Sequence, residues 1–197
     1  MTKVVKFPGS EPVKFGPEKA RNKKKSKPEV PGQLNLFGGR VVRLGSLSTF
    51  EEALWLDEHG ELHRAKELYL KAVKEEENIA DSYCNLGIIE SQNGNYARAI
   101  DCFTQSLKHD PRHLESHYNL ANLYAEVGNF ELAKVHYLVA IEIEPDFPNS
   151  YFNLGLTYAM NREYKEAAVV LSNYLKMTPA EENEHVHSLV RQLMDTF

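Results

Sequence analysis

Apolar and small residues in this chain recur every 34 positions. Leu86 is followed at this spacing by Leu120 and Leu154, and a glycine or an alanine comes directly after each leucine. The same period separates four alanines and three prolines: Ala65, Ala99, Ala133 and Ala167, then Pro111, Pro145 and Pro179. Self-similarity at a fixed period of this size predicts a stacked array of repeats and not one closed globular core.

Each repeat is predicted to be a pair of helices joined by a short turn. The repeats cover four ranges: 46–79, 80–113, 114–147 and 148–181. The turn carries a glycine in the first three repeats, where the end of a helix favours a left-handed residue. In the fourth repeat Arg162 takes this place, and we expect Asn161 before it to adopt that conformation. In the second helix an alanine precedes an aromatic residue or leucine by four positions, so that both lie on the face toward the first helix.

This pattern resembles the tetratricopeptide repeat, in which W-x2-L-G-x2-Y is followed by A-x3-F and then by proline. The resemblance covers residues 46–181 and is strongest in the second to fourth repeats. The first repeat departs from the family pattern, because Glu52 and Glu77 stand where leucine and proline are expected. The resemblance implies an all-α fold, a right-handed α-solenoid of four helix-turn-helix repeats.

Residues 182–197 are predicted to form one amphipathic helix that caps the fourth repeat. Its apolar stripe has helical spacing: Val186, Leu189, Val190, Leu193 and Met194. Its opposite face is polar: Arg191, Gln192 and Asp195. A helix that forms a dimer is the alternative, so the chain is expected to be a monomer or a weak dimer.

Charge divides the chain into a basic tail and an acidic body. Residues 1–45 hold 11 lysines and arginines against 3 acids, a net charge of +8, whereas residues 46–197 hold 12 against 25, a net charge of −13. Proline, glycine and mutually repelling lysines predict that this tail is disordered. The cluster Lys19–Lys27 can contact nucleic acid through phosphates, act as a transport signal, or simply be a solvated tail.

One apolar motif lies within the tail, at residues 33–37. Its sequence QLNLF resembles the pentapeptide with which bacterial replication and repair proteins bind the sliding DNA clamp. That resemblance implies a polar subsite for Gln33 and an apolar pocket for Leu36 and Phe37. Alternatively, the apolar residues between 34 and 44 cover the exposed edge of the first repeat.

No arrangement of residues that would support catalysis is found in the sequence. There is no nucleophile–base pair, phosphate-binding glycine loop or paired carboxylate motif, so we expect a non-enzyme without a cofactor. Pro111 separates His109 from His113 and His117, and a metal site is not expected there. The two cysteines indicate a reducing compartment. No apolar run is long enough for a membrane span, and a cytoplasmic location is expected.

The first helices of the repeats are expected to line a concave, peptide-binding groove, as the family resemblance implies. Three of them carry an asparagine at the same position, and a further amide follows in the third repeat: Asn85, Asn119 and Asn153, then Asn122. Such amides can hydrogen-bond a peptide main chain, and the row is similar to the asparagine ladder of O-linked sugar transferases. The alternative is that they satisfy local backbone groups or face water.

Charge favours one kind of ligand for this groove. The four first-helix segments contain no lysine or arginine, and Asp81, Glu115 and Asn149 stand where chaperone adaptors of the family bind a terminal carboxylate with basic residues. We therefore expect a scaffold that binds an extended neutral or basic peptide, with apolar pockets near Tyr118 and Phe152. An adaptor that reaches DNA or a clamp through its tail is the alternative function. A further hypothesis is that the basic tail occupies the groove of its own chain.

Overall fold

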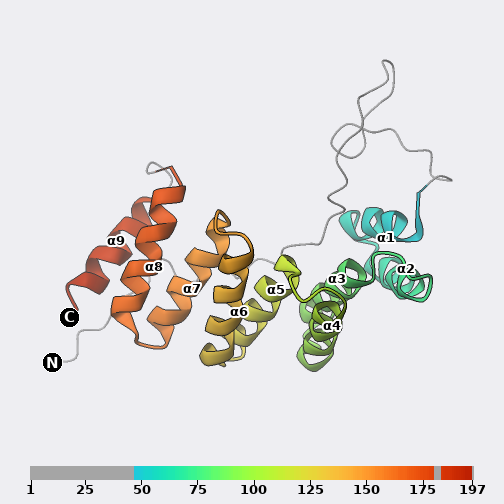
Figure 1. Ribbon diagram of the computed structural model, residues 1–197, viewed down its shortest axis with the longest axis horizontal. Coiled ribbons are helices and arrows are strands. Elements are labelled where there is room, and N and C mark those ends of the chain that lie inside the picture. The colour runs from blue at the N-terminus through green and yellow to red at the C-terminus, as the bar shows by residue number, and fades with distance from the viewer. Residues whose placement is uncertain (1–46, 180–182, 197) are drawn as a thin grey trace, which may run out of the picture. The chain divides into compact units, whose positions relative to one another are not determined.

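The computed structural model describes residues 47–179 and 183–196, and this part of the chain is all-α (Figure 1). Its helices are α1 (Thr49–Glu58), α2 (Leu62–Lys74), α3 (Ile79–Gln92), α4 (Tyr96–His109), α5 (Leu114–Glu126), α6 (Phe130–Ile143), α7 (Pro148–Met160), α8 (Tyr164–Met177) and α9 (Glu184–Met194). None of these helices is both long and apolar enough to cross a membrane. The tail motifs at 19–27 and 33–37 lie outside the described residues.

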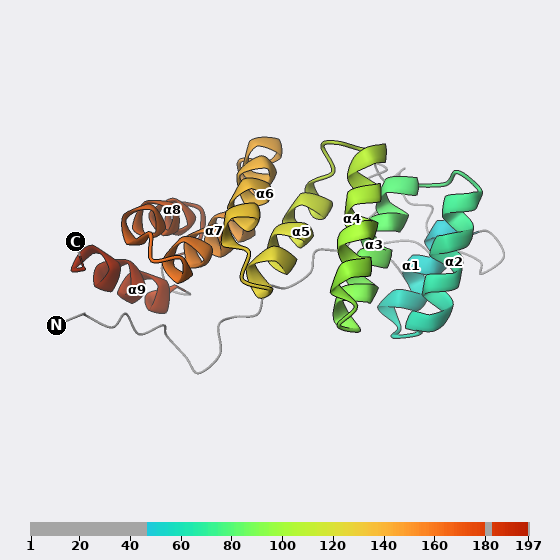
Figure 2. The same cartoon turned by 90° about the horizontal axis from the view of Figure 1, so that it is seen from below.

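The chain divides into two compact units between Pro111 and Arg112. The described residues of one unit form α1 to α4, and those of the other form α5 to α9. In each unit consecutive helices form side-by-side pairs, α1 with α2, α3 with α4, α5 with α6 and α7 with α8 (Figure 2). We call α1, α3, α5 and α7 the first helices and α2, α4, α6 and α8 the second helices. These pairs confirm the helix-turn-helix units that the period predicts.

Close contact within a pair depends on the small residue that follows the leucine recurring every 34 positions. A Cβ atom added at Gly87 would lie 2.7 Å from Cε1 of Phe103, and one at Gly155 would lie 2.6 Å from Cγ of Leu171. Phe103 and Leu171 are the apolar residues that the sequence predicts on the facing side of the second helix, and both are buried. The predicted packing of these pairs is confirmed.

The turns between paired helices use left-handed residues, as predicted for the first three repeats. Gly60, Gly94 and Gly128 have φ values of 80°, 74° and 80°. In the fourth pair Arg162 itself has a φ of 64°, whereas Asn161 has a φ of −81°. The expectation that Asn161 takes the left-handed conformation is therefore wrong. The register of the turn, and not the residue type, decides which position is left-handed.

Helix α9 covers the last pair of helices. Val186, Leu189, Val190 and Leu193 are buried and share one apolar cluster with residues of α7 and α8, among them Leu171. The predicted polar face of α9 is exposed. Met194 is wrongly placed by the sequence pattern, because its side chain is 55% exposed. It is the last residue of the helix, and it is not among the buried residues of α9.

Candidate functional site

Positive charge is absent from the first helices. None of α1, α3, α5 and α7 contains a lysine or an arginine, and the basic residues of the described chain lie on the second helices, in turns and on α9. Acidic residues, by contrast, are present on α1, α3 and α5. The first helices therefore have a negative or neutral character throughout both units.

Asn85 belongs to a buried polar chain that joins two helix pairs. Its Nδ2 donates to Oη of Tyr69 at 3.1 Å, and that hydroxyl donates to Oδ2 of Asp57 at 3.2 Å. Burial, and then the Asp57 carboxylate, raise the pKa of Tyr69 well above its ordinary value, so the hydroxyl keeps its proton. The amide thereby connects α3 to the preceding pair, α1 and α2.

Asn153 makes the corresponding connection in the other unit. Its Nδ2 donates to Oη of Tyr118 at 2.9 Å and to Oδ1 of Asn122 at 3.0 Å. Tyr137 donates to the same Asn122 oxygen at 2.5 Å. Burial raises the pKa of Tyr137 well above its ordinary value, so this phenol also remains a donor. The polar chain links α7 to both helices of the preceding pair.

All four predicted ladder asparagines are buried, with exposed fractions between 0% and 6%. The alternative considered from the sequence was that these amides satisfy local backbone groups or face water. In the structure Asn85, Asn122 and Asn153 form hydrogen bonds with tyrosine hydroxyls and with each other. Asn119 has the same register and is also buried. A peptide that contacts these amides has to share or replace such bonds, and their role in peptide binding stays a prediction.

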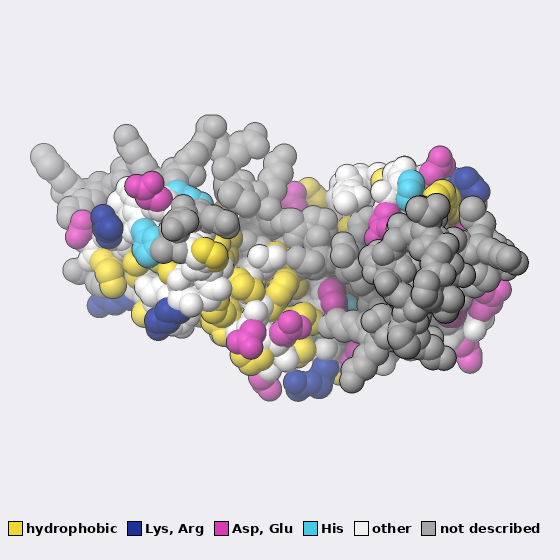
Figure 3. Space-filling model, turned by 90° about the horizontal axis from the view of Figure 1, so that it is seen from above, with side chains coloured by type: hydrophobic (Ala, Val, Ile, Leu, Met, Phe, Trp, Pro, Cys, Tyr) yellow, Lys and Arg dark blue, Asp and Glu magenta, His cyan; other side chains and the backbone are white. Residues whose placement is uncertain are grey.

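Three of the other predicted site residues, Asp81, Glu115 and Phe152, are more accessible than the asparagines. Asp81 and Glu115 are half-buried in the first turns of α3 and α5, where a carboxylate is stabilised by the helix N-terminus. Phe152 is also half-buried, and its ring lies 5.2 Å from that of Tyr174, whereas Tyr118 is buried. Figure 3 shows one face of the molecule, on which acidic and apolar side chains lie next to each other at the surface.

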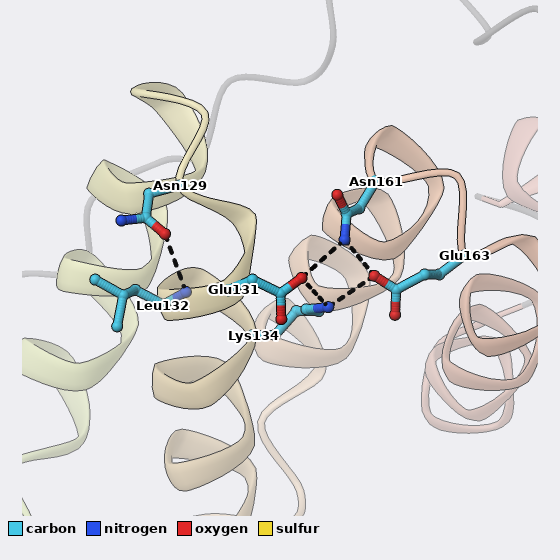
Figure 4. A network of polar contacts seen from close by, with 6 residues as sticks. All are labelled: Asn129, Glu131, Leu132, Lys134, Asn161 and Glu163. Atoms are coloured by element: carbon cyan, nitrogen blue, oxygen red, sulfur yellow. Dashed lines mark hydrogen bonds and ion pairs between the residues drawn. The ribbon is translucent and has the colours of Figure 1, made fainter.

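Two lysines of the second helices are neutralised by carboxylates. Lys134 donates to Glu131 at 2.8 Å and to Glu163 at 2.7 Å, and Asn161 donates to both carboxylates (Figure 4). Burial alone would lower the pKa of Lys134, but the two carboxylates hold it above its ordinary value. Lys66 donates in the same way to buried Glu90, whose pKa it lowers. These bonds tie α2 to the pair of α3 and α4, and α6 to the pair of α7 and α8.

The structure also brings together two histidines that the sequence does not connect. Nδ1 of His117 lies 3.0 Å from Nδ1 of His136, and Tyr124 stacks on His136 with ring centroids 5.7 Å apart. One imidazole must donate and the other accept, since two protonated rings would repel each other. The two histidines are 19 positions apart, and only the pairing of α5 with α6 joins them.

The described residues contain no group of three or more histidine, cysteine or acidic side chains that could hold a metal ion. His113, one of the histidines considered for a metal, instead caps α5. Its Nδ1 accepts a hydrogen bond from the backbone N–H of Ser116 at 3.1 Å. No signal in the sequence distinguishes this capping histidine from an exposed one.

Comparison with known proteins gives matches to three family models. Residues 80–113 and 102–134 match models described as tetratricopeptide repeat, and residues 121–161 match a model described as TPR repeat. A search of curated proteins finds no match. The chain carries tetratricopeptide repeats, as the resemblance in its sequence implies.

Solved structures share this fold at low sequence identity. The first TPR of Spaghetti (RPAP3), bound to the HSP90 peptide SRMEEVD, is 22% identical with a TM-score of 0.54, and the match covers 59% of this chain and 90% of that one. MamA from Desulfovibrio magneticus RS-1 is 17% identical with a TM-score of 0.60 over 73% and 90%. The Arabidopsis OM64 TPR domain is 18% identical with a TM-score of 0.54 over 60% and 96%. Tetratricopeptide repeats are a scaffold fold for protein interactions, and at these identities the likeness establishes the fold alone.

Proposed function

We propose that this protein is a scaffold that binds an extended neutral or basic peptide on the surface formed by its first helices. The observation that carries the proposal is the complete absence of lysine and arginine from α1, α3, α5 and α7. A surface of this kind repels an acidic segment and attracts a basic one, and it accepts a neutral one without an unpaired charge. The chain acts as a binding module and not as an enzyme.

The half-buried carboxylates supply the charge preference. Asp81 and Glu115 occupy the same register position in the first turns of α3 and α5, and Asn149 occupies it in α7. In each unit, a lysine or arginine side chain of a ligand can pair with the carboxylate, Asp81 in one unit and Glu115 in the other. Ladder asparagines that share or exchange their present bonds can hydrogen-bond the main chain of the ligand, and half-buried Phe152 offers apolar contact.

The structure with SRMEEVD suggests a sharp negative probe. That peptide is bound by the RPAP3 repeat domain, and it carries three carboxylate side chains. We expect no measurable binding of SRMEEVD to this chain, while labelled 12-residue peptides with a net positive charge bind. Equal affinity for acidic and basic peptides in fluorescence polarisation would contradict the proposal.

A pair of surface variants tests which helices bind. The double variant Asp81→Asn, Glu115→Gln should weaken binding of the best basic peptide by about tenfold, which corresponds to about 1.4 kcal/mol. The matched control is Asp101→Asn, Glu142→Gln, which removes the same charges from exposed positions on second helices. If both variants lose the same affinity, the ligand responds to net charge and not to the first helices.

A second candidate function is that of an adaptor recruited to DNA or to a sliding clamp. It rests on the basic cluster Lys19–Lys27 and on the motif Gln33–Phe37, which lie outside the described residues. Binding of the full chain to duplex DNA should then fall steeply with salt, because phosphate contacts release counterions. A labelled 28–45 peptide that fails to bind a bacterial clamp, when a known clamp peptide binds it, rejects the clamp function.

A further inference from the structure

The first helix of the array presents an aromatic side chain between carboxylates. Trp55 is the only tryptophan of the chain, and its half-buried ring packs against the core cluster of this unit. His59 stacks on the indole with ring centroids 4.1 Å apart, and the Nδ1–H of His59 donates to the Trp55 carbonyl oxygen at 2.7 Å. Glu52 and Glu58 stand three positions before and after Trp55, on the same side of α1.

The four acidic residues of α1 fall into two groups. Glu51 caps the helix by accepting from the Ser48 backbone N–H at 3.0 Å, and Asp57 is buried against Tyr69. Within the described residues, no hydrogen bond or ion pair occupies the side-chain carboxylate of Glu52 or Glu58. Glu58 is exposed and Glu52 is half-buried, so both carboxylates are accessible to a ligand.

Among the residues that the structure describes, no lysine or arginine forms an ion pair with Glu52 or Glu58. α1 has no lysine or arginine, and two lysines of the neighbouring helix α2 pair with other carboxylates. Lys66 donates to Glu90, and Lys71 lies 3.6 Å from Glu75. An indole ring flanked by two carboxylates favours a lysine or arginine side chain, because the charged head group pairs with the carboxylates while the methylene stem packs on the exposed part of the ring.

We propose that the basic segment Lys19–Lys27 of the same chain binds this face of α1. Its charge and its distance along the chain from α1 identify this segment as the ligand. The segment is the densest cluster of positive charge in the sequence, and it precedes α1 by about 20 residues, a length whose random-coil r.m.s. span is on the order of 25 Å. Helix α1 has 10 residues and a length of about 15 Å, so its whole face lies within reach.

This inference rests on the proposed function, since α1 belongs to the same set of first helices. A tethered segment has an effective concentration of about 1 mM, and a ligand from another protein has to compete with it. The segment therefore acts as a built-in competitor at the first repeat. A basic ligand displaces the segment more readily than a neutral ligand does, because the basic ligand and the segment pair with the same carboxylates.

Trp55 reports on the segment directly. Acrylamide quenching of its fluorescence is measured on the full chain at about 20 mM and about 500 mM NaCl, between which the Debye length falls from roughly 20 Å to 4 Å. The segment shields the indole at low salt and leaves it at high salt. We expect the Stern–Volmer constant to rise by about twofold, since a site of millimolar affinity is half occupied at an effective concentration of about 1 mM.

Two tail variants with equal charge changes locate the effect. Lys23→Glu, Lys24→Glu, Lys25→Glu should abolish the salt dependence of quenching, whereas Lys3→Glu, Lys6→Glu, Lys14→Glu should retain it. The double variant Glu52→Gln, Glu58→Gln on α1 should also abolish the salt dependence of quenching. Its circular dichroism should be unchanged, which checks that it folds. Wild-type quenching that does not change with salt, or two tail variants that behave alike, overturns the inference.

Two further outcomes are distinguished in the same assay. Quenching that changes with protein concentration assigns the segment to a second copy of the chain and overturns the intrachain contact. Peptide binding that still depends on Asp81 and Glu115, in the absence of any effect on Trp55, rejects the tail contact and leaves the scaffold function intact. Loss of peptide binding with an intact tail effect rejects the scaffold function alone.

Discussion

Gly87 gives the sharpest test of how the helix pairs are packed. An alanine at this position places a methyl group 2.7 Å from Cε1, 2.8 Å from Cδ1 and 2.9 Å from Cζ of Phe103. The ring is 1% exposed, so it cannot relieve the contact by turning into solvent without uncovering apolar surface. Overpacking of this kind costs about 1 to 3 kcal/mol, whereas replacing glycine by alanine inside a helix gains about 1 kcal/mol. We therefore expect Gly87→Ala to lower the free energy of unfolding by up to about 2 kcal/mol.

The assay is urea unfolding followed by circular dichroism at 222 nm, with Trp55 fluorescence as a second probe in the same unit. The double variant Gly87→Ala, Phe103→Val is the control, because shortening the ring side chain removes the clash. In the Phe103→Val background Gly87→Ala should be neutral or stabilising, with a coupling energy of about 1 to 3 kcal/mol. A Gly87→Ala chain that is more stable than the wild type refutes the argument, since propensity would then outweigh packing.

Three other predictions concern the same fold. Lys134→Met should lower the free energy of unfolding by about 1 to 2 kcal/mol in urea titrations, because it leaves Glu163 partly buried without its cation, while Lys71→Met on the exposed surface should change it by less than about 0.5 kcal/mol. Burial, and then His117, lower the pKa of His136 from 6.5 to about 4, so the unfolded chain takes up this proton at higher pH than the folded chain does. Stability should therefore decrease as pH falls from 6.5 to 4, by up to about 3 kcal/mol. Urea midpoints at several pH values test this, and a His136→Phe chain with the same pH dependence would reject it. Arg162→Gly should raise the thermal midpoint, with a gain of about 0.5 to 1 kcal/mol, since Arg162 has a positive φ that glycine adopts without strain. A lowered midpoint would show that Arg162 makes contacts worth more than this strain.

The period of 34 residues was sufficient to predict the helix pairs and their internal packing. Gly87, Phe103, Gly155 and Leu171 meet as their register requires, because contacts within a pair are local in sequence. The two wrong predictions concern positions at which the chain departs from the regular pattern. Met194 ends the last helix, and Arg162 keeps the backbone conformation of the glycines at its register although its own residue type disfavours it.

The candidate site was less predictable, because its contacts join residues from different helices. Spacing alone gives the register of Asn85 but not that its amide turns toward Tyr69, the hydroxyl of the preceding second helix. The contact of His117 with His136 likewise depends on side-chain orientations across a helix pair. By contrast, the absence of basic residues from the first helices can be counted from the sequence once the helix bounds are known.

The hydrogen bonds of the asparagines mean that substitutions on the first helices have two different consequences. A substitution at Asn85 or Asn153 breaks a buried bond between successive helix pairs, so it alters stability together with any effect on a ligand. Substitutions at Asp81 and Glu115 alter the charge of the surface at half-buried positions in the first helical turns. Charge at the first-turn positions can therefore be altered without breaking a bond between helix pairs, whereas a change at the amides alters the packing of the array itself.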